Sequence, residues 1–198
     1  MKPTSKLKSR LMLLLIFAVG AAPAIAALVW YFNADDWRPV ATTNHGDLIT
    51  PPRAIKTAPL PLLDGGTLPA DWFRGQWSLV YAAPGECPRR CKKALYLTRQ
   101  IRLALGAKMN RVQRLFVATG SAAHAAALRR AHPDLTVVEV DDPAGRNFLA
   151  QFTTAGEPGA HIWLVDPRGR VMMVYRVSDD PNGVVADLKH LLKYSQLG

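Results

Sequence analysis

The sequence predicts one α/β domain built on a mostly parallel sheet, preceded by a single membrane-spanning helix. Two observations support this fold class. From residue 77 to the end, apolar strand-like runs alternate with helical patterns, as in parallel sheets covered on both faces. Residues 11–32 form an apolar run of 22 residues without a charge, against the roughly 20 that a helix needs to cross a bilayer. The 198 residues leave room for one ordinary domain besides this segment.

Residues 1–10 form a basic tail in front of the apolar run. Its cations are Lys2, Lys6, Lys8 and Arg10, and two acids, Asp35 and Asp36, follow the run. This charge asymmetry predicts a cytoplasmic N-terminus and places the remainder on the periplasmic side of a bacterial inner membrane. The alternative is a cleaved signal peptide, because Ala24-Ile25-Ala26 is a small-x-small site. We favour the uncleaved anchor over 11–32, since the apolar run continues beyond that site.

Residues 33–70 are rich in proline, threonine and glycine. Such residues interrupt helices and strands, and prolines favour a semi-rigid extended chain. The composition therefore predicts an extended Pro-rich tether over 33–70 and a globular domain over 71–198.

The formal net charge of +10 does not indicate a nucleic-acid-binding protein. The basic residues are spread along the chain, and no basic stripe is interleaved with aromatic residues as in single-strand binders. Two short basic clusters, Arg89-Arg90 and Lys92-Lys93, lie next to the cysteines. Anionic lipid or an acidic redox partner is the better match for this charge.

Each element of the domain can be assigned in order from its pattern. The expected strands are 77–83, 114–119, 135–140, 160–166 and 171–177, and the expected helices are 88–107, 122–131, 141–152 and about 179–194. In the third helix, Asp142 would be the cap and Pro143 the first helical residue. The last two strands form a hairpin, which adds antiparallel strands at one edge of the sheet.

Cys87 and Cys91 are the two cysteines of the chain, and the predicted order places them just past the end of the first strand, at the start of the first helix. Reaction sites in open α/β sheets form at this end of the strands. A spacing of four residues puts both sulfurs on one side of the first helical turn. The positive end of the helix dipole and the neighbouring cations favour the thiolate, which is the nucleophile and the metal-binding form.

Three uses of this pair are open from the residues alone. It could be a structural disulfide, a redox couple or part of a metal site. Two cysteines in an exported protein usually pair, but a loop that encloses three residues gains little stability from closure. A redox couple or a pair of ligands for a soft metal ion are therefore the stronger hypotheses.

The segment WSLVYAAPGECPRRCKKALYLTRQI resembles the opening strand, CPxxC loop and first helix of the Sco/SenC family. These are membrane-anchored thioredoxin-fold proteins that help load copper into cytochrome c oxidase. HIWLVDPRGRVMMVYRV resembles the closing hairpin of the family, with its Asp-Pro-x-Gly turn. The resemblance covers about residues 70–195. It implies a thioredoxin-like domain, and Cys87 and Cys91 as catalytic and copper-binding residues.

The chain departs from the family at the third copper ligand. The family has a histidine about eight residues before the aspartate of the turn, where this chain has Pro158 ahead of Asp166. His161 lies five residues before that aspartate and is the substitute candidate for the metal site. A methionine, Met172 or Met173, is a further soft-ligand candidate, and His45 lies in the predicted tether.

These observations predict a membrane-anchored, periplasmic Sco-like assembly factor for a respiratory copper oxidase. It would act by thiol–disulfide exchange through Cys87 and Cys91, with Cys87 as the attacking residue and an oxidase copper subunit or another assembly factor as partner. The first alternative is a Cu(I) chaperone that adds a third ligand such as His161. The second is a non-catalytic scaffold whose disulfide is inert.

Overall fold

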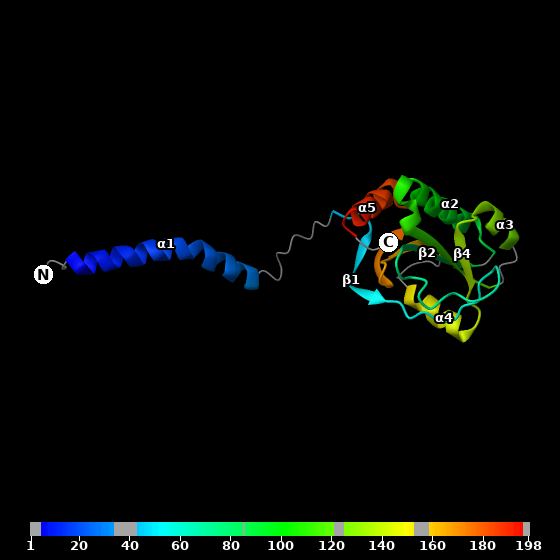
Figure 1. Cartoon of the computed structure of the whole chain (residues 1–198), viewed down its shortest axis with the longest axis horizontal. Coiled ribbons are helices and arrows are strands. Elements are labelled where there is room, and N and C mark those ends of the chain that lie inside the picture. The colour runs from blue at the N-terminus through cyan, green and yellow to red at the C-terminus, as the bar shows by residue number, and fades with distance from the viewer. Residues whose placement is uncertain (1–4, 34–42, 85, 121–124, 153–158, 196–198) are drawn as a thin grey trace. The chain divides into compact units, whose positions relative to one another are not determined.

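The computed structural model describes residues 5–33, 43–84, 86–120, 125–152 and 159–195. The chain divides into two compact units, Met1–Thr43 and Asn44–Gly198. The first contains helix α1, Ser5–Asn33, which includes Pro23 (Figure 1). Its stretch Leu7–Phe32, 26 residues long, is apolar and long enough to cross a membrane, so the expected candidate span is present.

The second unit is a six-stranded mixed sheet with the order β1-β6-β5-β2-β3-β4. Its strands are β1 (Asp47–Ala54), β2 (Trp77–Pro84), β3 (Val112–Thr119), β4 (Leu135–Glu139), β5 (His161–Val165) and β6 (Arg170–Arg176). Strands β2, β3 and β4 are parallel, whereas β5 and β6 form the antiparallel hairpin beside β2. The predicted α/β domain with a closing hairpin and helix is confirmed, but the sheet is mixed rather than mostly parallel, because β1, β5 and β6 all pair antiparallel.

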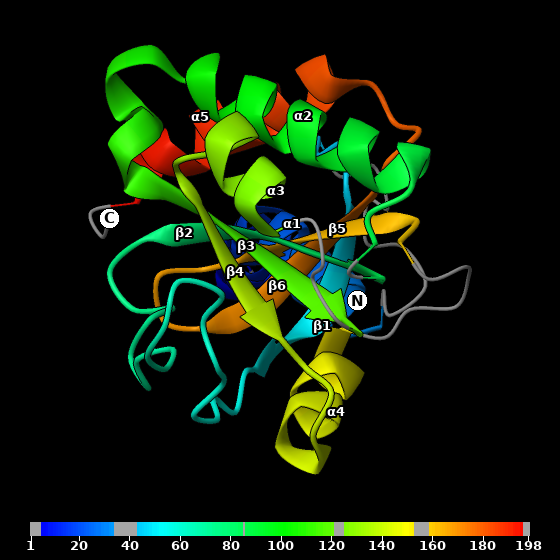
Figure 2. The same ribbon diagram turned by 90° about the vertical axis from the view of Figure 1, so that its right-hand side faces the viewer.

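Helices cover both faces of this sheet (Figure 2). They are α2 (Arg89–Leu103), α3 (Ala125–Ala131), α4 (Pro143–Leu149) and α5 (Pro181–Tyr194), with short 3-10 helices η1 (Gly106–Arg111) and η2 (Ala150–Phe152). Helices α2 and α5 lie side by side on one face, and α4 lies on the other. Two helix starts follow the expected chemistry, because the side chain of Asp142 accepts from Gly145 N at 2.7 Å and a proline follows the cap in both α4 and α5.

The alternation of side chains along β2 divides the core in two. Leu79 and Tyr81 belong to the apolar cluster beneath α2 and α5, whereas Val80 and Ala82 belong to the cluster beneath α4. Successive residues of a strand point to opposite faces, so one buried strand serves both clusters. Burial on both faces explains why β2 reads as a continuous apolar run.

The structure differs from the expected tether over residues 33–70. Residues from Asn44 onward belong to the compact domain, and β1 pairs antiparallel with β6 at the sheet edge. Pro51 and Pro52 lie inside β1, where an irregular register between Leu48 and Arg53 accommodates them. Proline is tolerated on an edge strand because one side of that strand has no ladder to complete. The sequence boundary at residue 71 therefore falls inside the folded unit.

Residues after β1 also pack rather than extend. Leu60 and Leu68 are 0% and 2% exposed and belong to the cluster beneath α4. Leu62 bridges Val138 in antiparallel fashion, which covers part of the outer edge of β4. Covering an edge protects its unpaired backbone groups, so this segment completes the sheet on its second side.

Candidate functional site

Cys87 and Cys91 form a disulfide between the end of β2 and the first turn of α2, with their Cα atoms 5.0 Å apart. The backbone N–H of Cys87 donates to Pro84 O at 2.9 Å, which makes a tight turn directly after the strand. Pro88 is the N-cap of α2, and its carbonyl accepts from Lys92 N at 3.0 Å. Strand end, turn and helix start thus fix the positions of both cysteines.

Cys87 has a left-handed backbone conformation, with φ of 45°. Among the described residues it is the single non-glycine residue with a positive φ. This conformation costs a non-glycine residue about 1–3 kcal/mol and is concentrated at functional sites. The CPxxC loop is therefore shaped to place the Cys87 sulfur next to the helix, at some cost in backbone energy.

Both cysteines are 1% exposed and belong to the apolar cluster beneath α2 and α5. A buried sulfur meets a protein-sized reactant only when neighbouring groups move aside. The immediate surface is charged: Arg89, Arg90, Lys92, Lys93 and Glu86 are exposed. The pair is thus a buried disulfide beneath a rim that carries four cations and one carboxylate.

Tyr81 supports this end of the sheet and was not singled out in the sequence. Its hydroxyl donates to Gly159 O at 3.0 Å, and Gly159 has a φ of 78°. A Cβ at position 159 would lie 3.0 Å from the Tyr81 hydroxyl oxygen, so glycine permits the close approach. Burial raises the pKa of Tyr81 to about 12, although the nearby Arg90 guanidinium opposes this rise. Tyr81 therefore remains a neutral donor at physiological pH.

The third candidate ligand, His161, is the first residue of β5 and pairs with Arg176 of β6. Its ring centroid lies 6.1 Å from that of Trp163. Within the part of the chain that the structure describes, no three His, Cys, Asp or Glu side chains gather as a metal-binding group. His161 is thus not brought together with the cysteine pair as a three-ligand set, and Pro158 lies outside the described residues.

His45 is bound to the domain instead of lying in a tether. Its ring Nδ1 lies 3.0 Å from Oδ1 of Asp187, a residue of α5 that is 6% exposed. The backbone N–H groups of His45 and Gly46 also donate to this carboxylate. The Tyr175 hydroxyl oxygen lies 3.2 Å from this carboxylate and 2.8 Å from Met173 Sδ, within hydrogen-bonding distance of both acceptors. This cluster ties the start of the domain to α5, and Met173 lies in it through its contact with Tyr175.

A buried ion pair fixes the other side of α2. The Arg114 side chain is 0% exposed and donates to both carboxylate oxygens of Asp134, at 3.1 and 3.2 Å. It also donates to Thr98 Oγ1 and, at 2.6 Å, to Leu95 O, which are groups of α2. Burial favours the neutral form of Asp134, but the charge and hydrogen bonds of Arg114 hold the Asp134 pKa below its usual value. No sequence pattern singled out this arginine.

A cavity of about 630 Å³ lies at the start of β4, next to Leu62, Trp72, His132 and Asp134. The parallel strands β2, β3 and β4 begin at this end of the sheet, whereas the cysteine pair follows the end of β2. The cavity and the disulfide therefore lie at opposite ends of the sheet.

The domain matches a family model described as "Transmembrane-like, thioredoxin-like, C-terminal domain" over residues 77–195. No curated protein matches the chain. Many solved structures do match.

Three of these structures show the range of the likeness. Yeast Sco1 with copper bound is 18% identical, with a TM-score of 0.60, covering 69% of this chain and 90% of that one. Bradyrhizobium japonicum ScoI with copper bound is 20% identical, with a TM-score of 0.56 and coverages of 69% and 99%. Apo Sco1 from Thermus thermophilus is 22% identical, with a TM-score of 0.58 and coverages of 77% and 99%. The predicted resemblance to Sco/SenC proteins is confirmed, and at these identities it establishes the fold.

Proposed function

The chain belongs to the transmembrane-like, thioredoxin-like C-terminal domain family, and we propose that within this fold Cys87 and Cys91 act as a dithiol/disulfide couple on cysteines of a client protein. The observation that carries this proposal is the placement of their disulfide at the end of β2 and the start of α2. Reaction sites of open α/β sheets form at that end of the strands.

Two features favour exchange over a structural staple. The disulfide closes a loop with a sequence separation of 4, and such a short loop removes little entropy from the unfolded chain. Cys87 holds a left-handed conformation, a cost that a simple staple would not require. The start of α2 also stabilises a thiolate at Cys91, since helix N-termini favour negative charge.

In the reduced protein, the Cys87 thiolate attacks one sulfur of a client disulfide and forms a mixed disulfide, releasing one client thiolate. Cys91 then attacks the Cys87 sulfur of the mixed disulfide, closing the Cys87–Cys91 bond and releasing the second client thiolate. Two electrons pass from the protein to the client, and the two thiol protons leave with them. Both cysteines are 1% exposed in the oxidised state, so each round of exchange requires local opening around the pair.

The setting of this chemistry is the membrane surface. We assign α1 as an uncleaved inner-membrane anchor with a cytoplasmic N-terminus and the domain as periplasmic. The apolar stretch Leu7–Phe32 and the basic residues before it support this topology. The client we propose is the copper-binding subunit of a respiratory oxidase, or another of its assembly factors. The Sco-type fold supports this client, and a reduced cysteine pair is what a copper site of that kind needs before loading.

Copper transfer is the second candidate, with Cu(I) as cargo. Reduced Cys87 and Cys91 would supply two soft sulfur ligands, which suit Cu(I). The donor set is incomplete among the described residues, because His161 does not gather with the pair in a metal-binding group. We therefore expect weaker Cu(I) binding than a three-ligand site would give, and exchange remains the preferred function over both copper transfer and an inert scaffold.

The trapping of a mixed disulfide tests the proposal. A Cys91→Ser variant lacks the resolving sulfur, so it should accumulate a disulfide-linked client adduct that a non-reducing gel and mass spectrometry can detect. The matched Cys87→Ser variant should trap less if Cys87 is the attacking residue. Absence of any adduct, together with normal oxidase maturation in a Cys87→Ser/Cys91→Ser strain, would favour the scaffold.

A further inference from the structure

We propose that the exposed cations around the disulfide form a docking surface for an acidic segment of the client. The inference rests on the proposed exchange reaction and adds the chemistry of its partner. We call these residues the α2 basic surface: Arg89, Arg90, Lys92 and Lys93, all of them exposed. Within residues 89–93 the one uncharged and buried residue is Cys91, which supplies the second sulfur of the pair.

The geometry of α2 places these cations around the route to the sulfurs. Each residue advances about 100° around a helix, so Arg90 and Lys92 flank Cys91 on its two sides. Arg89 and Lys93 continue the charge onto the outer face of the same turn. A client sulfur that reaches the pair must therefore approach within a side-chain length of several cations.

Among the described residues of the CPxxC loop and the first turn of α2, cations outnumber acids. Glu86 is the acidic residue beside the cysteines in the sequence, and the first turn of α2 contains none. The other described acids near this end of the sheet lie at the start of β1, at or after the end of β4, and after β6: Asp47, Glu139, Asp141, Asp142, Asp179 and Asp180. Strand β4 lies two positions from β2 in the sheet, whereas Asp179 and Asp180 directly precede α5, the helix that packs beside α2. The loop and the first turn of α2 carry four exposed cations against Glu86, so the immediate surroundings of the pair have a net positive charge.

An acidic protein segment matches this surface better than a lipid headgroup layer does. The cations surround the reactive sulfurs and not a flat face, and the reaction needs a partner that brings a disulfide to them. Complementary charge concentrates such a partner at the site and raises its rate of encounter by about 10-fold or more at low salt. The predicted partner is a client whose cysteines are followed or preceded by aspartate and glutamate residues.

The test uses the reduced full chain in phosphatidylcholine nanodiscs and three disulfide-closed peptides of equal length. Aspartates flank the cysteines of the first peptide, serines those of the second and lysines those of the third. Each reaction oxidises the Cys87–Cys91 dithiol and reduces one peptide disulfide, so two electrons and two protons pass from the protein to the peptide. The aspartate peptide should react about 10-fold faster than the lysine peptide at low salt, and the ratio should shrink as salt is added.

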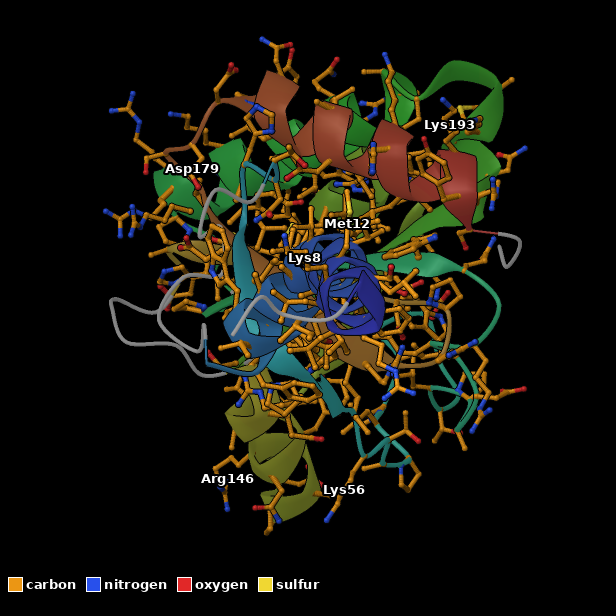
Figure 3. The ribbon with its side chains drawn as sticks, turned by 90° about the vertical axis from the view of Figure 1, so that its left-hand side faces the viewer. Lys8, Met12, Lys56, Arg146, Asp179 and Lys193 are labelled. Carbon is orange, nitrogen blue, oxygen red and sulfur yellow. A yellow bond between two sulfur atoms is a disulfide. The ribbon has the colours of Figure 1, made fainter. Side chains whose placement is uncertain are left out.

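The decisive variant is Lys92→Glu/Lys93→Glu, in which the ratio of aspartate to lysine peptide rates should fall to about one or below. Its matched control is Lys189→Glu/Lys193→Glu, which changes the net charge equally on exposed positions of α5. Lys193 lies at the far end of α5 from Asp179 (Figure 3), and Arg111, just ahead of β3, donates to Leu192 O near that end. The control should keep the parent ratio because it changes charge at the other end of the sheet from the disulfide.

The outcomes separate this inference from the proposed function. The docking surface would be overturned, with exchange left intact, if the three peptides reacted at equal rates. It would also be overturned if the ratio of aspartate to lysine peptide rates fell equally in Lys92→Glu/Lys93→Glu and in Lys189→Glu/Lys193→Glu. Equal peptide rates that all slow when phosphatidylglycerol enters the nanodisc would assign the surface to lipid and also overturn it. Failure of every peptide to react would remove the exchange function, and the docking surface with it.

Discussion

Replacing Asp134 with asparagine should destabilise the domain because it leaves the Arg114 charge without a counter-ion. The Arg114 side chain is 0% exposed, and its Nη1 lies 3.1 Å from Asp134 Oδ1. At an effective dielectric constant of about 20, two charges about 4 Å apart attract by roughly 4 kcal/mol. The Asp134 side chain is 25% exposed, and asparagine keeps one acceptor oxygen, so we expect a loss of about 2–3 kcal/mol in unfolding free energy.

Urea unfolding of the full chain in neutral detergent measures this loss, with the fluorescence of the buried Trp77 and Trp163 as the signal. Asp71→Asn is the control, because Asp71 is exposed and such a substitution changes stability by about 0.5 kcal/mol or less. The double variant Arg114→Met/Asp134→Asn removes both charges and should be more stable than Asp134→Asn alone. A loss below about 0.5 kcal/mol for Asp134→Asn, or additive losses in the double variant, would refute the reasoning.

Three further predictions follow from other contacts. Asp187→Asn removes the charge of a 6% exposed carboxylate that accepts from the backbone N–H groups of His45 and Gly46. Amide hydrogen exchange at the start of the domain should therefore accelerate by about 10-fold or more. Unchanged protection of these amides would contradict this prediction. Burial, with the Arg114 and Arg99 charges, lowers the pKa of His132. The unfolded chain therefore takes up a proton at higher pH than the folded chain does, so the unfolding free energy should fall as pH drops through about 6.5, by at most ~1.4 kcal/mol per pH unit. The fall should be shallower in His132→Gln. Equal slopes in the two proteins would exclude a contribution of His132 to the pH dependence. Gly145→Ala should cost about 1–3 kcal/mol on thermal unfolding, because the new Cβ would lie 2.6 Å from a backbone atom of Val140; a wild-type melting temperature would contradict the packing.

Much of the fold follows from local pattern. The buried strand β2 reads as an apolar run, and Asp142-Pro143 marks a helix start, because burial and capping depend on neighbouring residues. β1 escaped prediction since Pro51 and Pro52 read as breakers, and only the edge position of the strand makes them acceptable. The edge position depends on pairing with β6, more than a hundred residues later in the chain.

In the candidate site, too, local features could be predicted from the sequence and long-range contacts could not. The spacing of Cys87 and Cys91 after a strand was enough to predict their place at a helix start, because that geometry is local. The contact of Tyr81 with Gly159 and that of His45 with Asp187 join residues 78 and 142 positions apart. No periodicity carries such information, since these contacts exist only after the sheet and α5 have assembled.

The reduction potential of the Cys87–Cys91 disulfide distinguishes a redox couple from an inert structural bond. The full chain in neutral detergent would be equilibrated in buffers of defined thiol/disulfide ratio, and its thiols trapped and counted by mass spectrometry. If the pair is a redox couple, we expect a potential above about −300 mV, in the range of disulfides that exchange. A potential below about −300 mV would mark an inert structural bond and contradict the proposed function.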